Sequence, residues 1–138
     1  MKKSAHGRAK DRAWYWFAKF IKLRDCLKTT GTDHMFYCIS CARPKELGHG
    51  GHAGHLVSGR HNSVLFDEDG VNAQCAYCND HLKGNYAEYR PRLVKKIGED
   101  RVKACESRKH EAKTFTEEDL RTISAEFRKK YHDLEEKA

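Results

Sequence analysis

Two cysteine pairs are the residues whose types and spacing point most directly to chemistry in this chain. Each pair has the form Cys-x-x-Cys, one in "CISC" and the other in "CAYC", and residues 42–74 separate them. Two thiolates at this spacing can occupy two ligand positions around a zinc ion, and a second pair completes the tetrahedron. The sequence therefore predicts a closed structural zinc site with four ligands: Cys38, Cys41, Cys75 and Cys78.

The segment between and just after these pairs is rich in histidine and asparagine: it contains His49, His52, His55, His61, Asn72, Asn79 and His81. A fold fastened by both cysteine pairs brings these side chains near one another. A divalent ion with few nitrogen or oxygen ligands keeps positions open for water and phosphate, and an unbound histidine can take the proton of the attacking water. The group favours a strand-strand-helix metal nuclease, although each histidine taken alone is more simply a solvated loop residue.

Helices are expected on both sides of this central segment. Early in the chain, apolar residues recur at helical spacing opposite a basic side, which predicts an amphipathic helix over residues 11–28. Towards the other end, Thr116 and Asp119 form an acidic variant of the capping box ahead of a helix with one apolar stripe. Two shorter helices are expected between these two: residues 85–98 and residues 99–107.

Short strands and a glycine-rich loop are expected within the central segment. The stretch "FYCISC" predicts a strand that enters the first cysteine turn, and residues 44–54 predict a loop. Two further short strands are expected at "HLVS" and "VLF", and a helix is expected from about Asn79 to Leu82.

The composition limits the class of protein. A length of 138 residues with 38% hydrophobic content predicts one domain, or a compact centre with helical additions, whose lean core a metal ion would help to stabilise. The net charge of +7 favours a polyanionic partner. The basic start is not followed by the apolar stretch of a signal peptide, and no apolar run is long enough to span a bilayer. We therefore expect a cytoplasmic protein with reduced cysteines and no membrane partner.

Several motifs, taken in order, resemble a known family. "YCISC", "AGH" and "LFDEDGVNAQCAYCNDHLKGNYAEYR", followed by "LVKKIG", are similar to the phage recombination nuclease family called NinG or Rap, over roughly residues 37–102. The resemblance implies an HNH-type, structure-selective DNA endonuclease that acts on branched recombination intermediates such as Holliday junctions and D-loops. It also implies a bacteriophage protein that works in the cytoplasm of the bacterial host.

The expected fold class is α+β: a small zinc-stapled ββα-metal (HNH) core with flanking N- and C-terminal α-helices. Three parts are expected along the chain. Residues 1–35 would form a basic aromatic helix, residues 36–98 the zinc-knuckled HNH nuclease core, and residues 99–138 a C-terminal helical segment.

The resemblance extends to individual residues. By similarity to the zinc-knuckled HNH junction resolvases of other phages, Asn79 binds the catalytic ion and His55 is the general base. The acidic metal ligand expected of the family falls at His52, so Zn²⁺, Ni²⁺ and Co²⁺ become candidates beside Mg²⁺ and Mn²⁺. Asn72 would orient His55 or the scissile phosphate. His81 is a third metal ligand, a phosphate contact or a helix-surface residue.

DNA contacts are expected from Lys83, Asn85 and Arg90, which follow the second cysteine pair. Cutting two opposed strands requires two sites, so a homodimer is expected, with phage or host recombination proteins as further partners. Two other readings of the sequence stay open. One is a non-catalytic zinc-knuckle adaptor that binds nucleic acid, and the other is a sequence-reading HNH enzyme of the homing or restriction type.

Overall fold

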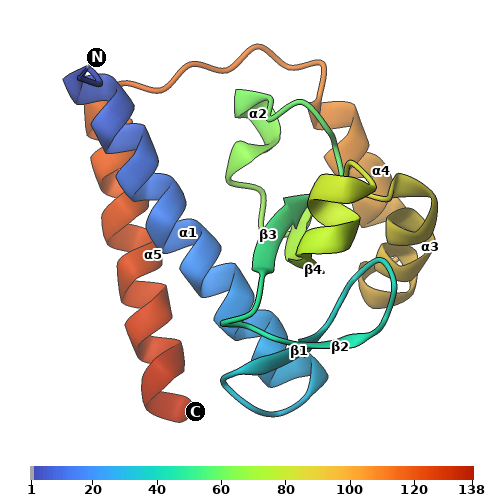
Figure 1. Ribbon diagram of the computed structural model, residues 1–138. Coiled ribbons are helices and arrows are strands. Elements are labelled where there is room, and N and C mark those ends of the chain that lie inside the picture. The colour runs from blue at the N-terminus through green and yellow to red at the C-terminus, as the bar shows by residue number, and fades with distance from the viewer. Residues whose placement is uncertain (1) are drawn as a thin grey trace.

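Two long helices from opposite ends of the chain lie side by side along one flank of the molecule (Figure 1). The computed structural model describes residues 2–138. Helix α1 covers Ala5–Thr29 and helix α5 covers Glu117–Lys137. Phe17 of α1 meets Phe127 of α5 edge to face, with 4.8 Å between the ring centroids. Both predicted flanking helices are therefore confirmed.

The start of each long helix is capped by a side chain. The Ser4 hydroxyl accepts a hydrogen bond from the Gly7 amide at 3.0 Å. At α5, the Thr116 hydroxyl accepts from the Asp119 amide, and the Asp119 carboxylate accepts from the Thr116 amide. This reciprocal pair is the predicted capping box, which supplies acceptors for amides that the first helical turn leaves without partners.

Two small antiparallel sheets lie beside α1. Strand β1 (Met35–Tyr37) pairs with β2 (Pro44–Glu46), and β3 (Gly51–His55) pairs with β4 (Val71–Cys75). A short helix, α2 (Asn62–Leu65), lies in the connection between β3 and β4. Helices and small sheets together confirm the α+β class.

The glycine-rich segment differs from the sequence prediction. The predicted loop over residues 44–54 contains strand β2 and most of β3, and "VLF" belongs mainly to helix α2 instead of a strand. Gly54 shows why β3 is hard to recognise. A Cβ at this position would lie 1.9 Å from Oε1 of Gln74, so the glycine leaves room for a buried side chain of β4.

Helices η1 (Tyr77–His81), α3 (Tyr86–Ile97) and α4 (Glu99–Arg108) cover the β3–β4 sheet on the side away from α5. Helix η1 follows β4 directly and is a single π-helical turn, beginning two residues before the expected helix. Helices α3 and α4 then enclose a buried apolar cluster: Leu56, Tyr89, Leu93, Val102 and Cys105. This cluster joins residues on both sides of the expected division at residue 98. The three-part division itself stays a prediction.

A buried carboxylate connects three of these elements. Asp25 of α1 is 3% exposed, and its oxygens accept hydrogen bonds from Arg24 at 2.9 Å and from the Lys96 ammonium of α3 at 3.0 Å. The Ala73 amide of β4 donates to the same carboxylate at 2.7 Å. Helix α1, the central hairpin and α3 are therefore held together by one network of charged groups.

Among the helices of residues 2–138, none combines the length and the apolar character that crossing a bilayer requires.

Candidate functional site

Four cysteine sulfurs meet where the two sheets approach each other. Cys38 and Cys41 lie in the turn after β1, whereas Cys75 ends β4 and Cys78 lies in η1. The four Sγ atoms lie within 4.8 Å of one another. This juxtaposition confirms that the two Cys-x-x-Cys pairs form one cluster that could hold a metal ion.

The spacing of the sulfurs fits zinc. A tetrahedral ion with zinc–sulfur bonds of about 2.3 Å places its sulfurs about 3.8 Å apart. The Sγ atoms of Cys41 and Cys75, which belong to different pairs, are 3.9 Å apart. The donor set is wholly thiolate and three of the four cysteines are buried, as in closed structural zinc sites.

Backbone and amide N–H groups surround the sulfurs. The Cys75 amide donates to the Cys38 sulfur at 3.3 Å, and the Asn85 side-chain amide donates to the Cys78 sulfur at 3.4 Å. Burial raises the pKa of the Cys78 thiol to about 12, so without a cation this thiol keeps its proton at neutral pH. Binding of zinc would displace such protons, and folding and metal binding are therefore coupled.

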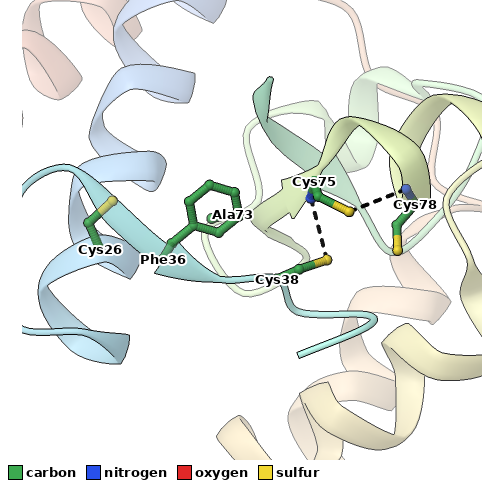
Figure 2. Close-up of a cluster of buried hydrophobic side chains, with 6 residues drawn as sticks. All are labelled: Cys26, Phe36, Cys38, Ala73, Cys75 and Cys78. Carbon is green, nitrogen blue, oxygen red and sulfur yellow. Dashed lines mark hydrogen bonds between the residues drawn. The ribbon is translucent and has the colours of Figure 1, made fainter. Parts of the chain in front are cut away.

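The other two cysteines lie outside the cluster. Figure 2 shows Cys26 on the far side of Phe36 from Cys38, Cys75 and Cys78. Cys105 is buried in the apolar cluster beside α3 and α4. Both belong to the apolar core.

The zinc cluster places one histidine beside the asparagine that follows it. His52 lies on β3 and Asn79 on η1, and the Asn79 amide nitrogen is 2.9 Å from Nδ1 of His52. The carboxylate of Asp80 lies 3.9 Å from the same ring nitrogen, and its side chain is 72% exposed. An imidazole, an amide and a carboxylate thus gather at a solvent-accessible junction of strand and helix.

Asp80 was missed by the sequence reasoning. It follows Asn79 directly in "CNDH", so the signal was its adjacency to the expected ligand. Its carboxylate supplies the kind of hard oxygen that divalent ions prefer and that His52 does not provide.

His55 lies on the opposite face of strand β3 from His52. In this hairpin His52 pairs with Gln74 and His55 pairs with Val71, and side chains alternate between faces along a strand. The His55 ring stacks on Trp14 of α1, at 5.2 Å between centroids with 18° between planes. The two histidines expected to share a site therefore point to different sides of the hairpin.

The hydrogen-bond partner of His55 shows which of its ring nitrogens carries the hydrogen. Its Nε2 lies 3.1 Å from the carbonyl oxygen of Leu65, which can only accept, so Nε2 carries the hydrogen and Nδ1 carries the lone pair. Burial lowers the pKa of His55, so the ring is neutral at pH 7. It also lines an open cavity of about 360 Å³ together with Lys83, Tyr86 and Lys109.

Asn72 belongs to the buried polar network and does not adjoin His55. Its cross-strand partner is Gly54, so its side chain points to the face opposite His55. The Asn72 amide donates to the Tyr89 hydroxyl at 3.1 Å, and its oxygen accepts from Arg24 at 3.2 Å. Asn72 therefore lies among groups that stabilise the fold. Its expected role in orienting His55 stays a prediction.

The remaining expected site residues lie in varied surroundings. The His81 ring stacks on Tyr77 at 4.9 Å and, among the described residues, makes no hydrogen bond to His52 or Asn79. Lys83 is exposed. Asn85 lies at the edge of the zinc cluster, where its side-chain amide donates to the Cys78 sulfur. The Arg90 guanidinium is paired with Glu106 at 2.9 Å and Glu99 at 2.7 Å, so its charge is already neutralised.

Comparisons with known proteins agree with the motifs. The family model described as "Bacteriophage Lambda NinG protein" matches residues 2–137. "Protein ninG" of Escherichia phage 933W is 35% identical over 106 residues, which cover 74% of this chain and 50% of that protein. "Protein ninG" of Escherichia phage lambda and of Salmonella phage P22 are each 34% identical over 106 residues, covering 74% of this chain and 49% of each relative. The chain spans about half the length of these curated relatives, and no solved structure matches it.

Proposed function

Because the chain belongs to the NinG family of bacteriophage proteins, we propose that it is a metal-dependent DNA endonuclease that cleaves branched recombination intermediates such as Holliday junctions and D-loops. The observation that carries the proposal is the approach of His52 to Asn79 at 2.9 Å, directly after the zinc cluster. The net charge of +7 supports binding to a polyanion.

His52, Asn79 and Asp80 would hold the catalytic ion. Their nitrogen and oxygen donors lie at a solvent-accessible junction, so the site fits an ion that keeps open positions. Such an ion supplies Lewis-acid stabilisation of the charge that develops on the phosphate and the leaving oxygen. Asp80 restores the carboxylate that His52 does not provide, so Mg²⁺ and Mn²⁺ stay candidates beside Zn²⁺, Ni²⁺ and Co²⁺.

His55 would act as the general base. The Leu65 carbonyl fixes its tautomer, Trp14 holds the plane of its ring, and its neutral form carries a free lone pair on Nδ1. Lys83 in the same cavity would bind a phosphate oxygen.

One observation favours a second function. His52 and His55 lie on opposite faces of β3, and His55 packs against Trp14. A zinc-knuckled adaptor that binds nucleic acid without cleaving it would need neither residue to react. The same experiment distinguishes these two functions and a sequence-reading HNH enzyme.

The test is nicking of a four-way junction and of a linear duplex by the zinc-loaded protein, with Mg²⁺, with Mn²⁺ and with no added divalent ion. We expect nicking that needs the added ion and prefers the junction. Asn79→Ala and His55→Gln should each lower the rate about a hundredfold, whereas His34→Gln, an exposed histidine outside the site, should not. Absence of nicking with every metal would favour the adaptor. Nicking of one duplex sequence over the junction would favour the sequence-reading enzyme.

The pH dependence of nicking supplies a second prediction. Burial lowers the pKa of His55 below its ordinary value of about 6.5. The unprotonated base is therefore present at and above that pH, and is lost only as the pH falls through the lowered pKa. We expect kcat/KM for nicking to stay level from about pH 8 to 6.5 and to fall below that. An acid limb centred above pH 7 would assign the base to another group.

We also propose a homodimer, phage or host recombination proteins as partners, and action in the bacterial cytoplasm. Cutting opposed strands of a junction requires two active sites. Sedimentation of the protein with and without a four-way junction measures whether two copies assemble.

A further inference from the structure

A basic groove lies between helices α1 and α5. The two helices lie side by side along one flank of the molecule (Figure 1). It is an open cavity of about 520 Å³. One wall comes from α1, with Arg12 and Trp16, and the other from α5, with Arg121 and Arg128. None of these residues belongs to the zinc cluster or to the proposed nuclease site.

The groove holds more positive than negative charge. Arg12 and Arg128 are exposed, and neither forms an ion pair with any residue in the range 2–138. Arg121 has only Glu117, at 3.5 Å. Asp133 is the single carboxylate among the lining residues, and Lys129 already binds it at 2.7 Å.

Several other arginines of the protein are neutralised, although Arg8, Arg43, Arg60 and Arg92 also lack an ion pair among the described residues. Arg90, Arg101 and Arg108 each form an ion pair with one or more of Asp67, Asp69, Glu99 and Glu106. Arg12 and Arg128 line the groove from different helices without such a partner, and like charges in one groove repel. An external anion that spanned both helices would relieve this repulsion.

The Trp16 ring holds one arginine of the groove, Arg128, in place. The Arg128 guanidinium lies over the Trp16 ring, 5.4 Å from the centroid, and Trp16 also contacts Tyr131 and His132. A guanidinium held against a ring loses less freedom when it binds a phosphate, and its planar fork can donate two hydrogen bonds to phosphate oxygens. Phosphodiester backbone suits a row of such groups, because its charges repeat along a line.

We infer that the α1–α5 groove is a second DNA-contact surface, which holds the phosphate backbone of a substrate segment other than the one being cut. A branched molecule can present one arm to the groove while another arm lies at His52 and Asn79. This inference rests on the DNA binding in the proposed function and not on cleavage.

The test compares two double variants with equal loss of charge. Arg12→Gln with Arg128→Gln removes the unpaired arginines of the groove. Lys95→Gln with Lys103→Gln removes two exposed lysines from α3 and α4 and is the matched control. Binding of the zinc-loaded proteins to a fluorescent four-way junction is measured over a range of salt concentrations without added divalent ion. Melting curves confirm that both variants are folded.

The groove variant should bind the junction about tenfold or more weakly near 0.1 M salt. The slope of log affinity against log salt should become shallower by about two, since each lost phosphate contact contributes about 0.9. The control should change affinity about twofold or less, because charges beyond about 10 Å from a phosphate are screened at this salt.

Equal junction affinity and equal salt dependence of the two double variants would overturn the inference, whether or not the protein nicks DNA. Loss of binding in the groove variant alone would support it even if nicking were absent with every metal. The nicking assay decides the proposed function separately.

Discussion

Replacing Cys75 with serine is expected to unfold the protein. Cys75 lies at the end of β4, and its sulfur is 3.9 Å from that of Cys41 in the four-cysteine cluster. Structural zinc contributes about 10–16 kcal/mol in small zinc modules, whereas a folded domain is stable by only about 5–15 kcal/mol. A serine hydroxyl is not ionised at neutral pH and does not replace the thiolate, so most of that contribution would be lost.

Zinc content and thermal unfolding by circular dichroism measure this effect. The unchanged protein should contain one zinc per chain, and removal of the metal by a strong chelator should reproduce the unfolding of Cys75→Ser. Cys26→Ala is the matched control, because it deletes a buried thiol outside the cluster. It should keep its zinc and lose on the order of 1 kcal/mol of stability. A Cys75→Ser protein with unchanged melting and zinc content would contradict the zinc assignment.

Replacing Asp25 with alanine is expected to destabilise the fold by about 3–5 kcal/mol, because it leaves buried cations without their counter-charge. Burial on its own would raise the pKa of Asp25, but Arg24 and Lys96 outweigh it and lower the pKa. The carboxylate is therefore ionised in the folded protein at neutral pH. Its removal would also leave the Ala73 amide of the central hairpin without an acceptor.

Denaturant unfolding at pH 7 measures this loss, and the pH dependence identifies its origin. Because the folded pKa is lowered, the stabilisation is present above the ordinary pKa of about 3.9 and is lost as the pH falls through the folded value. The difference between the two proteins should accordingly shrink in acid. Asp11→Ala, which removes an exposed partner of Lys3, is the control and should unfold close to the unchanged protein. A similar small effect for Asp25→Ala would show that the network contributes little.

The parts of the fold that the sequence predicts well depend on local chemistry. Two Cys-x-x-Cys turns bring their thiols together within a few residues, so spacing is enough to identify the ligands. The cap of α5 likewise depends on Thr116 and Asp119 alone. The apolar stripe of α1 is periodic over many residues and therefore stands out against its basic side.

The strands of the central hairpin could not be read in the same way. β3 contains glycines that have low strand propensity, and its existence depends on pairing with β4, a contact across the sequence. A segment that the sequence predicts as a loop carries no expected alternation of faces. The family resemblance places His52 and His55 in one site, whereas the pleat puts their side chains on opposite faces of the strand.

The candidate metal site was predicted in part. His52 and Asn79 do meet, because the four-cysteine cluster fixes the start of η1 against β3. Asp80 follows Asn79 directly, but the family resemblance places the acidic ligand at the position of His52 and so does not indicate Asp80. The surroundings of Asn72 and Arg90 depend on distant partners in α1, α3 and α4, which no local motif reveals.

The pairing of α1 with α5 has a consequence for the order in which the chain can fold during synthesis. Phe17 emerges from the ribosome long before Phe127, the residue that covers it. Until α5 has been made, the part of the first helix that packs on Phe127 stays exposed, although Val71 and Phe66 can already cover other parts of its aromatic side. The zinc cluster is complete earlier, once Cys78 has emerged, so the metal would organise the centre of the molecule before its flank closes.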